Sequence, residues 1–123
     1  MKHHFDTDIQ GAELTVLQVL WEAGEPLPLA AILDTLHIRR GWADSTVKTL
    51  LRRLQEKGAV TLQKRGVYAA AIAREDYRGA ANHSFLQKLY QGSAKSLVAS
   101  LVQEGKLTQE DIAELTNLFR KED

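Results

Sequence analysis

The chain has 123 residues, of which 44% are hydrophobic and 26% are charged, and its basic and acidic side chains are equal in number. This composition is typical of a folded protein and excludes overall disorder. There is no cysteine, which excludes disulfides, thiolate metal sites and cysteine nucleophiles. The polar first residues predict no signal peptide. No apolar run approaches the ~18 residues that a membrane span needs, so we expect a cytoplasmic protein without membrane insertion.

Two helices are predicted in the first forty residues. Residues 11–23 form the first, because apolar side chains recur there at helical spacing, namely Leu14, Leu17, Leu20 and Trp21. Residues 25–28 are expected to be a short connection. Proline suits the first position of a helix, which places the second helix from Pro28 to about Leu36. Residues 37–42 are expected to form a turn.

A third helix is predicted over residues 44–57, and its two faces differ. One face is an apolar stripe at positions i, i+3, i+4 and i+7, formed by Val47, Leu50, Leu51 and Leu54. The other face is polar and carries Ser45, Lys48, Thr49, Arg52, Gln55 and Glu56. We expect Asp44 or Ser45 to cap this helix by accepting hydrogen bonds from the N–H groups of the first turn.

A β-hairpin is predicted after Gly58, where the apolar period changes to two. Its strands are expected over residues 59–63 and 67–72, joined by the tight turn Lys64-Arg65-Gly66. Three helices followed by a hairpin with a basic tip is the order of a winged helix-turn-helix. We therefore predict a mainly α-helical protein with a small β-hairpin, in which residues 1–73 form a winged-helix DNA-binding domain.

The neutral net charge hides a basic segment. Residues 39–66 carry a net charge of +6, whereas the other 95 residues carry −6. By its charge alone, such a basic segment could equally be a solvated helix face. A recognition helix, however, packs on one face, exposes short polar and basic side chains on the other, and enters the major groove by its first turns. The third helix fits this description, so duplex DNA is the predicted partner.

Ten residues are the predicted DNA contacts. The first turns of the third helix carry the expected base contacts, Ser45, Thr46, Lys48 and Thr49. Two expected phosphate contacts lie one turn further, Arg52 and Arg53. The flanking backbone would be held from the preceding turn and from the hairpin tip by Arg39, Arg40, Lys64 and Arg65. Other roles stay open, since the hydroxyls could only cap the helix, Arg53 could pair with an acid, and the hairpin tip could be a solvated turn.

Residues 74–123 are predicted to form a helical dimerisation domain. Apolar pairs recur four or eight residues apart, at Phe85, Leu86, Leu89, Tyr90, Leu97, Val98, Leu101 and Val102. Gly92 predicts a kink or a break, and Thr108 with the acids that follow it opens a last helix. That helix is expected to turn four side chains inward, Ile112, Leu115, Leu118 and Phe119. Three of them are also predicted dimerisation residues, namely Ile112, Leu115 and Phe119. A domain of about fifty residues is only marginally stable on its own. We therefore expect a two-fold homodimer. A core within one chain is the alternative.

Three segments of the chain resemble the penicillinase repressor family (BlaI/MecI/CopY). They are Ala12–Trp21 (AELTVLQVLW), Trp42–Leu54 (WADSTVKTLLRRL) with Lys57-Gly58 beyond, and His83–Gly92 (HSFLQKLYQG) with Ser96-Leu97-Val98 beyond. The resemblance covers about residues 9–119. It implies homodimers that bind palindromic operators and repress genes of β-lactam resistance or copper handling. The family's contact positions on the recognition helix fall on Ser45, Thr46, Lys48, Thr49 and Arg53.

The chain departs from this family where the inducing signal acts. Copper-responsive members carry a C-terminal cysteine cluster, which is absent here. β-Lactam-responsive members are cleaved between Asn and Phe by a membrane-bound sensor protease, which the resemblance implies as a further partner. The aligned bond is Ser100–Leu101, a candidate cleavage site with different side chains. The family's Ser-Pro at the start of the recognition helix is Ala43-Asp44 here, which leaves Asp44 as the expected cap.

The sequence bears on two other function classes. A regulator of the same fold could respond to a ligand or a metal, and its candidate metal ligands would be the four histidines, His3, His4, His37 and His83. An enzyme is not expected, because the sequence has no Gly-rich phosphate loop, no His-Glu-x-x-His and no nucleophile with a plausible base. No cofactor or bound metal is expected.

Overall fold

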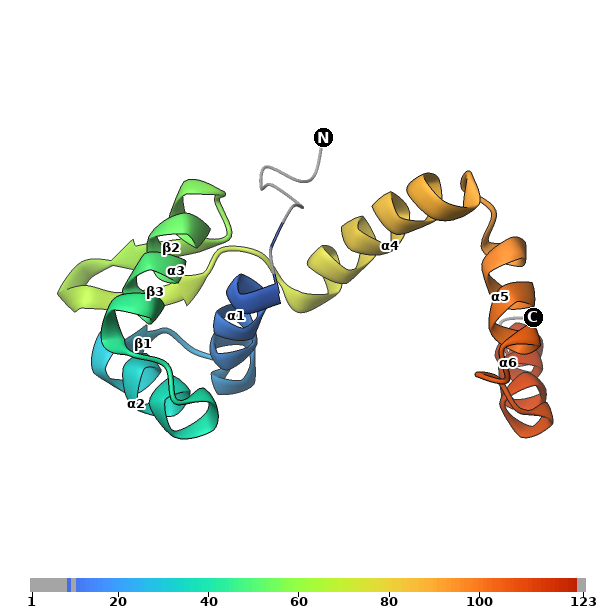
Figure 1. The fold of residues 1–123 in the computed structure, drawn as a ribbon, viewed down its shortest axis with the longest axis horizontal. Helices are drawn as coiled ribbons and strands as arrows, with labels where there is room; N and C mark the ends of the chain where they lie inside the picture. Colours follow the sequence, from blue (N-terminus) through green and yellow to red (C-terminus); the bar gives the residue numbers. More distant parts are fainter. Residues whose placement is uncertain (1–8, 10, 122–123) are drawn as a thin grey trace. The chain divides into compact units, whose positions relative to one another are not determined.

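The computed structural model describes residue 9 and residues 11–121 (Figure 1), and the chain divides after Ala81 into two compact units. The first unit contains, in order, α1 (Gly11–Ala23), β1 (Leu27–Pro28), α2 (Leu29–Arg40), α3 (Asp44–Glu56), β2 (Val60–Gln63) and β3 (Val67–Ala70). Helix α4 (Arg74–Tyr90) starts in the first unit and ends in the second. The second unit also contains α5 (Ala94–Gln103) and α6 (Gln109–Lys121).

The three strands form one antiparallel sheet in the order β1-β3-β2. The predicted hairpin is confirmed, with Val60 opposite Ala70 and Gln63 opposite Val67. The prediction of a plain connection over residues 25–28 was wrong, because Leu27 pairs with Tyr68 and forms an edge strand. Proline is tolerated at the end of that strand, since an edge strand does not need every N–H.

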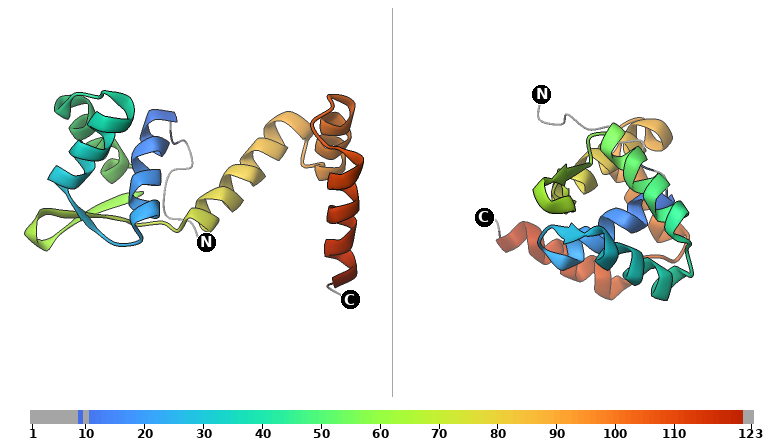
Figure 2. Two further views of the ribbon diagram at one scale, coloured as in Figure 1. Left: turned by 90° about the horizontal axis from the view of Figure 1, so that it is seen from below. Right: turned by 90° about the vertical axis from the view of Figure 1, so that its left-hand side faces the viewer.

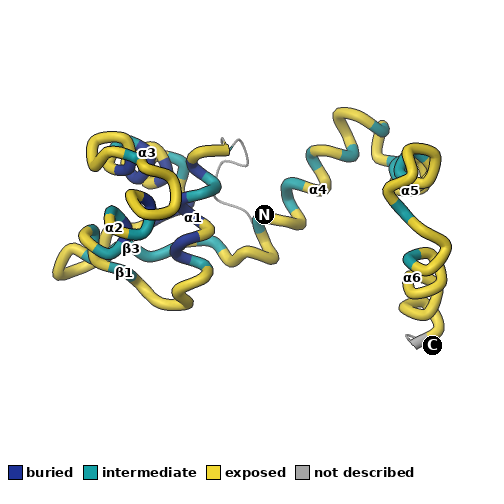
Figure 3. The backbone as a smooth tube through the Cα atoms, turned by 60° about the horizontal axis from the view of Figure 1, so that its bottom comes forward, coloured by how far each residue is buried: buried dark blue, intermediate teal, exposed yellow. Residues whose placement is uncertain are grey.

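The core of the first unit lies between the helices and the sheet. The apolar face of α3 is buried and those of α1 and α2 are mostly buried, with Leu14 and Trp21 half-buried, and Figure 2 shows these helices over one side of the sheet. The buried hydrophobic residues are Val16, Leu17, Val19, Leu20, Ile32, Leu36, Val47, Leu50, Leu51, Leu54, Ala59 and Val60. Figure 3 shows the buried segments gathered in this unit. Trp42 is half-buried against the same cluster.

The ends of α2 and α3 differ from the prediction. Helix α2 continues through Arg40, because the left-handed residue that ends it is Gly41, with φ 67°. The predicted turn over residues 37–42 therefore begins four residues too early. The expected cap at Asp44 or Ser45 was also wrong. Ala43 is the N-cap and makes no side-chain hydrogen bond, and its carbonyl accepts from the N–H of Thr46 and Val47.

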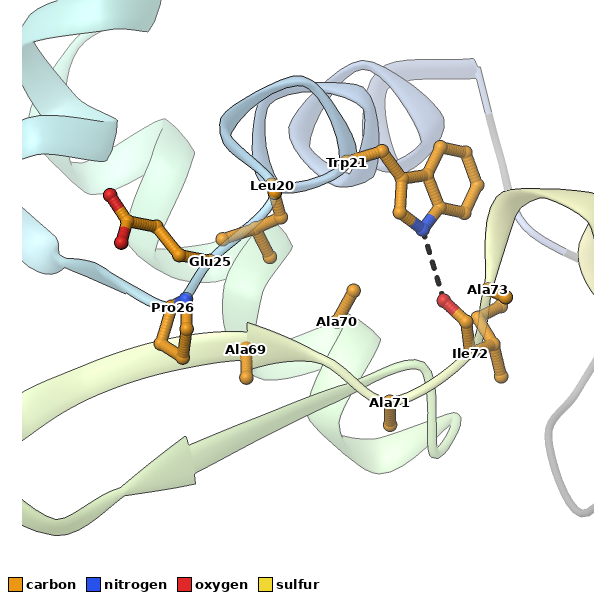
Figure 4. A pocket seen from close by; sticks show the side chains of 10 residues that line it. Leu20, Trp21, Glu25, Pro26, Ala69, Ala70, Ala71, Ile72 and Ala73 are labelled. Carbon is orange, nitrogen blue, oxygen red and sulfur yellow. Dashed lines mark hydrogen bonds between the residues drawn. The ribbon is translucent and has the colours of Figure 1, made fainter.

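Trp21 joins the end of α1 to the chain that leaves the sheet. Its indole Nε1 donates to the Ile72 carbonyl at 3.0 Å, beside a hollow lined by four alanines of the segment 69–73 (Figure 4). The Arg74 guanidinium lies 5.6 Å from the centre of the indole ring, and the Tyr77 ring lies 6.0 Å from it. These contacts fix the first turns of α4 on the first unit.

A partly buried charge pair links α1 to the end of α3. Glu13 is 1% exposed, and its carboxylate oxygen lies 2.7 Å from the Lys57 ammonium. The sequence pattern did not anticipate this pair, because a glutamate in an amphipathic helix is usually on the solvent side. Burying the Glu13 carboxylate is tolerated because it meets the opposite charge of the partly exposed Lys57.

The second unit consists of α5, α6 and the later turns of α4. The predicted break at Gly92 is confirmed, since α4 ends at Tyr90 and Gly92 has φ 83°. The predicted cap at Thr108 is also confirmed: its hydroxyl accepts from the Asp111 N–H, and the Asp111 carboxylate accepts from the Thr108 N–H, both at 3.0 Å.

No residue from 82 to 120 is buried in the single chain. The prediction that α6 turns its apolar side chains inward was therefore wrong for one chain, since Ile112 is 40% exposed and Phe119 is 78% exposed. The alternative of a core within one chain likewise does not form over this range. The sequence pattern correctly located the apolar face, but it could not tell what covers that face.

Candidate nucleic-acid interface

Helix α3 presents a polar face opposite its buried stripe. Ser45, Thr46 and Lys48 are exposed in its first turns, and Thr49 is half-exposed. Arg52 and Arg53 are exposed one turn further. The face arises because Val47, Leu50, Leu51 and Leu54 are all buried in the core, which leaves these six side chains outside. The predicted amphipathic geometry of this helix is thus confirmed.

Hydroxyl groups and a guanidinium converge on one flank of α3. Ser45, Thr46, Thr49 and Arg53 line a shallow depression together with Leu50. Among the described residues Arg53 has no acid within 4.0 Å, so the alternative role as a salt-bridge partner is not seen there. Lys48 and Arg52 do not line this depression. The depression therefore brings together four of the six predicted contacts on this helix.

The last turn of α2 holds two arginines with different surroundings. The Arg39 guanidinium lies 2.7 Å from the Glu22 carboxylate of α1, and both side chains are about half exposed. Arg40 is exposed, and within the described part of the chain no acid lies within 4.0 Å of it. With Lys57 paired to Glu13, two charges of the basic segment are compensated by α1. The free charge of the segment is thus concentrated on α3, Arg40 and the hairpin tip.

The hairpin tip exposes both of its basic side chains. Lys64 and Arg65 are exposed, and Arg65 has φ 69°, followed by Gly66 with φ 73°. A left-handed backbone is unfavourable for a residue with a Cβ, by about 1–2 kcal/mol. The turn therefore holds Arg65 in a conformation that glycine or asparagine would adopt more easily.

One exposed charged residue in the first turn of α3 is absent from the predicted contacts. Asp44 is exposed at the first position of α3, and its carboxylate makes no capping hydrogen bond. The signal was present in the sequence, because Ala43-Asp44 replaces the expected Ser-Pro. Sequence reasoning assigned the aspartate to capping, and the structure gives that position to Ala43.

The described residues form neither a metal-binding cluster nor a membrane-spanning helix. Across residue 9 and residues 11–121, no three histidine, cysteine or carboxylate side chains lie close enough to hold a metal ion. His37 and His83 are exposed on α2 and α4, and the predicted pair His3-His4 falls outside the described residues. Within the same range, no helix is both long and apolar enough to cross a bilayer.

Known proteins are similar to this chain in sequence and in fold. The family model described as "Penicillinase repressor" matches residues 9–121. The chain belongs to the penicillinase repressor family. It is 32% identical over 116 residues to the penicillinase repressor of Bacillus licheniformis, covering 92% of this chain and 90% of that protein. It is 28% identical over 117 residues to the methicillin resistance regulatory protein MecI of Mammaliicoccus sciuri, covering 93% and 94% respectively.

The fold comparison agrees with the family. The solution structure of the DNA binding domain of the repressor BlaI matches with a TM-score of 0.53 at 32% identity, covering 63% of this chain and 94% of that one. The penicillinase repressor resemblance and the winged-helix fold predicted from the sequence are therefore both confirmed.

The candidate cleavage bond Ser100–Leu101 lies within the regular helix α5. The Tyr90 hydroxyl donates to Ser100 Oγ at 3.3 Å, and Ser100 Oγ donates to the Glu104 carboxylate at 3.1 Å. Both residues of the bond are only half exposed. Access of a protease to this bond would therefore require α5 to unwind locally.

Proposed function

We propose that this chain is a transcriptional repressor that binds duplex operator DNA as a homodimer and controls β-lactam resistance genes. The observation that carries the proposal is the exposed hydroxyl and basic face of α3, held by a helix whose other face is fully buried. Membership of the penicillinase repressor family and the resistance functions named for its relatives support it. Residues 1–73 would bind DNA, and residues 74–123 would dimerise.

The residues of α3 take distinct roles on the duplex. A rigid helix with short polar side chains in its first turns suits the width of the major groove. Lys48 would donate to guanine O6 and N7, and Ser45, Thr46 and Thr49 would contact neighbouring base edges. The guanidinium groups of Arg52 and Arg53 lie deeper along the helix and would bind phosphates, which set the register without reading sequence.

The flanking phosphates would be held from two other elements. Arg40 and the hairpin tip, Lys64 and Arg65, project charges that meet no acid within the described part of the chain. We propose that Arg39 contributes less to phosphate binding than Arg40, because Glu22 already compensates its charge. Such contacts make affinity salt-dependent, since each neutralised phosphate releases counterions.

Dimerisation would cover the apolar faces of the second unit. A groove in this unit is lined by six residues of α5 and α6, Val98, Ile112, Leu115, Thr116, Leu118 and Phe119. Phe85 and Leu89 of α4 and Val102 of α5 are also at least two-fifths exposed. Contiguous exposed apolar surface marks an interaction site. A two-fold partner that contributes the same surface would bury it and would present two recognition helices to a palindrome.

The partly buried apolar residues of the second unit would complete the dimer interface. Leu86, Tyr90, Leu97 and Leu101 are half-exposed in the single chain. Each lies on the same helix as a more exposed apolar residue, so one partner surface would cover both. A dimer would thus supply the core that residues 82–120 lack in one chain.

Capture of genomic fragments tests the proposed function. The full-length protein is incubated with sheared genomic DNA of its source organism, and the bound fragments are sequenced. We expect enrichment of one palindromic sequence in the region upstream of a gene for β-lactam resistance. A variant with Arg52→Ala and Arg53→Ala is the control and should enrich far less. Enrichment upstream of unrelated genes alone would contradict the assignment to resistance genes, and no enrichment would contradict DNA recognition.

A further inference from the structure

Asp44 is the one acidic residue in the first turn of the recognition helix. It is exposed, it does not cap the helix, and no basic group within the described residues lies within 4.0 Å of a carboxylate oxygen of Asp44. The surrounding surface is otherwise suited to a polyanion. The negative charge of Asp44 repels the phosphates of an approaching duplex. Without it, the N-terminus of the helix would favour a phosphate.

We infer that Asp44 is a specificity-determining residue that accepts a hydrogen bond from the N4 amine of a cytosine in the operator; this inference rests on the proposed function. Among the four bases, cytosine is the one whose own major-groove edge presents only a donor, the N4 amine. Adenine also presents an amine, but its N7 acceptor lies next to that amine and would face the second carboxylate oxygen. Guanine and thymine present acceptors to the carboxylate. Cytosine is therefore the base that this group accepts best.

Lys48 lies one helical turn after Asp44 on the same side of α3. It is also exposed, and it is the predicted partner of guanine. Four residues of helix advance about 6 Å, whereas neighbouring base pairs are about 3.4 Å apart. Asp44 and Lys48 would therefore read different base pairs of the same half-site, one through an acceptor and one through donors.

The carboxylate would act on selectivity more than on affinity. A duplex with cytosine at the right position satisfies the carboxylate, and any other duplex leaves it facing acceptors and phosphates. Discrimination arises from this penalty on the wrong sequences. One base-specific contact of this kind discriminates by about 5- to 150-fold.

Selection from a random duplex library tests the inference with the full-length protein. The bound sequences are compared for the wild type and for Asp44→Asn, Lys48→Met and Glu56→Gln. Glu56 is the matched control, because it is an exposed acid at the other end of the same helix. Asp44→Ser is a second variant at the test position. Thermal melting confirms that each variant is folded before selection.

We expect the Asp44 variants to change the base preference at one position of each half-site. Asp44→Asn and Asp44→Ser should reduce the preference for cytosine there to less than about threefold, from the 5- to 150-fold range expected for a base contact. Their affinity for a scrambled duplex should rise about 2- to 5-fold as one repulsive charge is removed. Lys48→Met should alter a different position, and Glu56→Gln should leave the selected sequence unchanged.

Two results would overturn the inference. An unchanged selected sequence in both Asp44 variants would mean that the carboxylate only stabilises the helix. If the Asp44 variants instead lose base preference at the same base pair that Lys48→Met affects, Asp44 acts only through Lys48. Failure of the wild type to select any sequence would instead contradict the proposed function itself, so the two failures are distinguishable.

Discussion

Phe119 provides a test of the proposed dimer, because it is the most exposed of the apolar side chains on α6. We predict that Phe119→Asp dissociates the dimer without unfolding the single chain. The ring is 78% exposed in the single chain, so its replacement removes little packing there. In a dimer that covers this face, the same substitution removes a buried ring and inserts a charge.

The magnitude follows from the exposed fraction of the ring. Full burial of a phenylalanine side chain contributes about 1.5–3 kcal/mol. About four-fifths of that gain remains for the dimer to realise, or about 1–2.5 kcal/mol per copy. A two-fold interface contains the residue twice, so the loss is about 2–5 kcal/mol. The dimer dissociation constant should therefore rise about 30- to 5,000-fold.

Sedimentation equilibrium over a range of protein concentrations measures this change. Asn117→Asp is the matched control, because it places the same charge on an exposed position of the same helix without removing an apolar side chain. The wild type and the control should be dimeric, and Phe119→Asp should be largely monomeric. A Phe119→Asp protein that remains as dimeric as the control would place the interface elsewhere and refute this reasoning.

Three further predictions concern the DNA interface. Lys48→Ala should weaken operator binding by about 1–3 kcal/mol and relax selectivity at one base pair per half-site; fluorescence anisotropy on operator variants checks this, and uniform weakening across sequences would make Lys48 a phosphate contact instead. Arg40→Ala should reduce affinity more than Arg39→Ala, because Glu22 compensates Arg39; equal losses in the same titration would remove that distinction. Arg65→Gly should raise the free energy of unfolding by up to about 1 kcal/mol as backbone strain is relieved, while operator binding weakens; denaturant unfolding and anisotropy measure both, and stronger binding would exclude Arg65 as a contact.

Local signals in the sequence predicted much of the fold. The stripe of α3, the hairpin, the break at Gly92 and the cap at Thr108 each depend on spacing or on one residue's backbone preference, and the structure contains all four. The polar face of α3 followed directly from its buried stripe. These features were predictable because neighbouring residues alone determine them.

Features that depend on distant residues were not predictable. Strand β1 is two residues long and exists only because β3 pairs with it, so no period marks it. Glu13 is buried because Lys57, 44 residues later, reaches it. The α6 face reads as inward-facing in the sequence, yet it is exposed in the single chain. Periodicity shows that a face is apolar, but the element that covers it is a matter of tertiary or quaternary structure.

The sequence predicted which face of α3 is exposed, but it did not predict which basic residues form ion pairs. All six predicted contacts on α3 belong to the face opposite the buried stripe. The net charge of +6 predicted for the basic segment includes Arg39 and Lys57. In the structure, both are paired with acids of α1. It also assigned Asp44 to capping, because a cap position depends on where the backbone turns helical, which shifts easily by one residue.

The salt dependence of operator binding tests the central claim most directly. The dissociation constant of the full-length protein for a selected palindromic duplex is measured by anisotropy at ionic strengths from 50 to 200 mM. With about six to ten phosphate contacts per dimer, affinity should fall about 10³- to 10⁵-fold over this range. An affinity that does not change with salt would contradict recognition of duplex DNA by α3 and the hairpin tip.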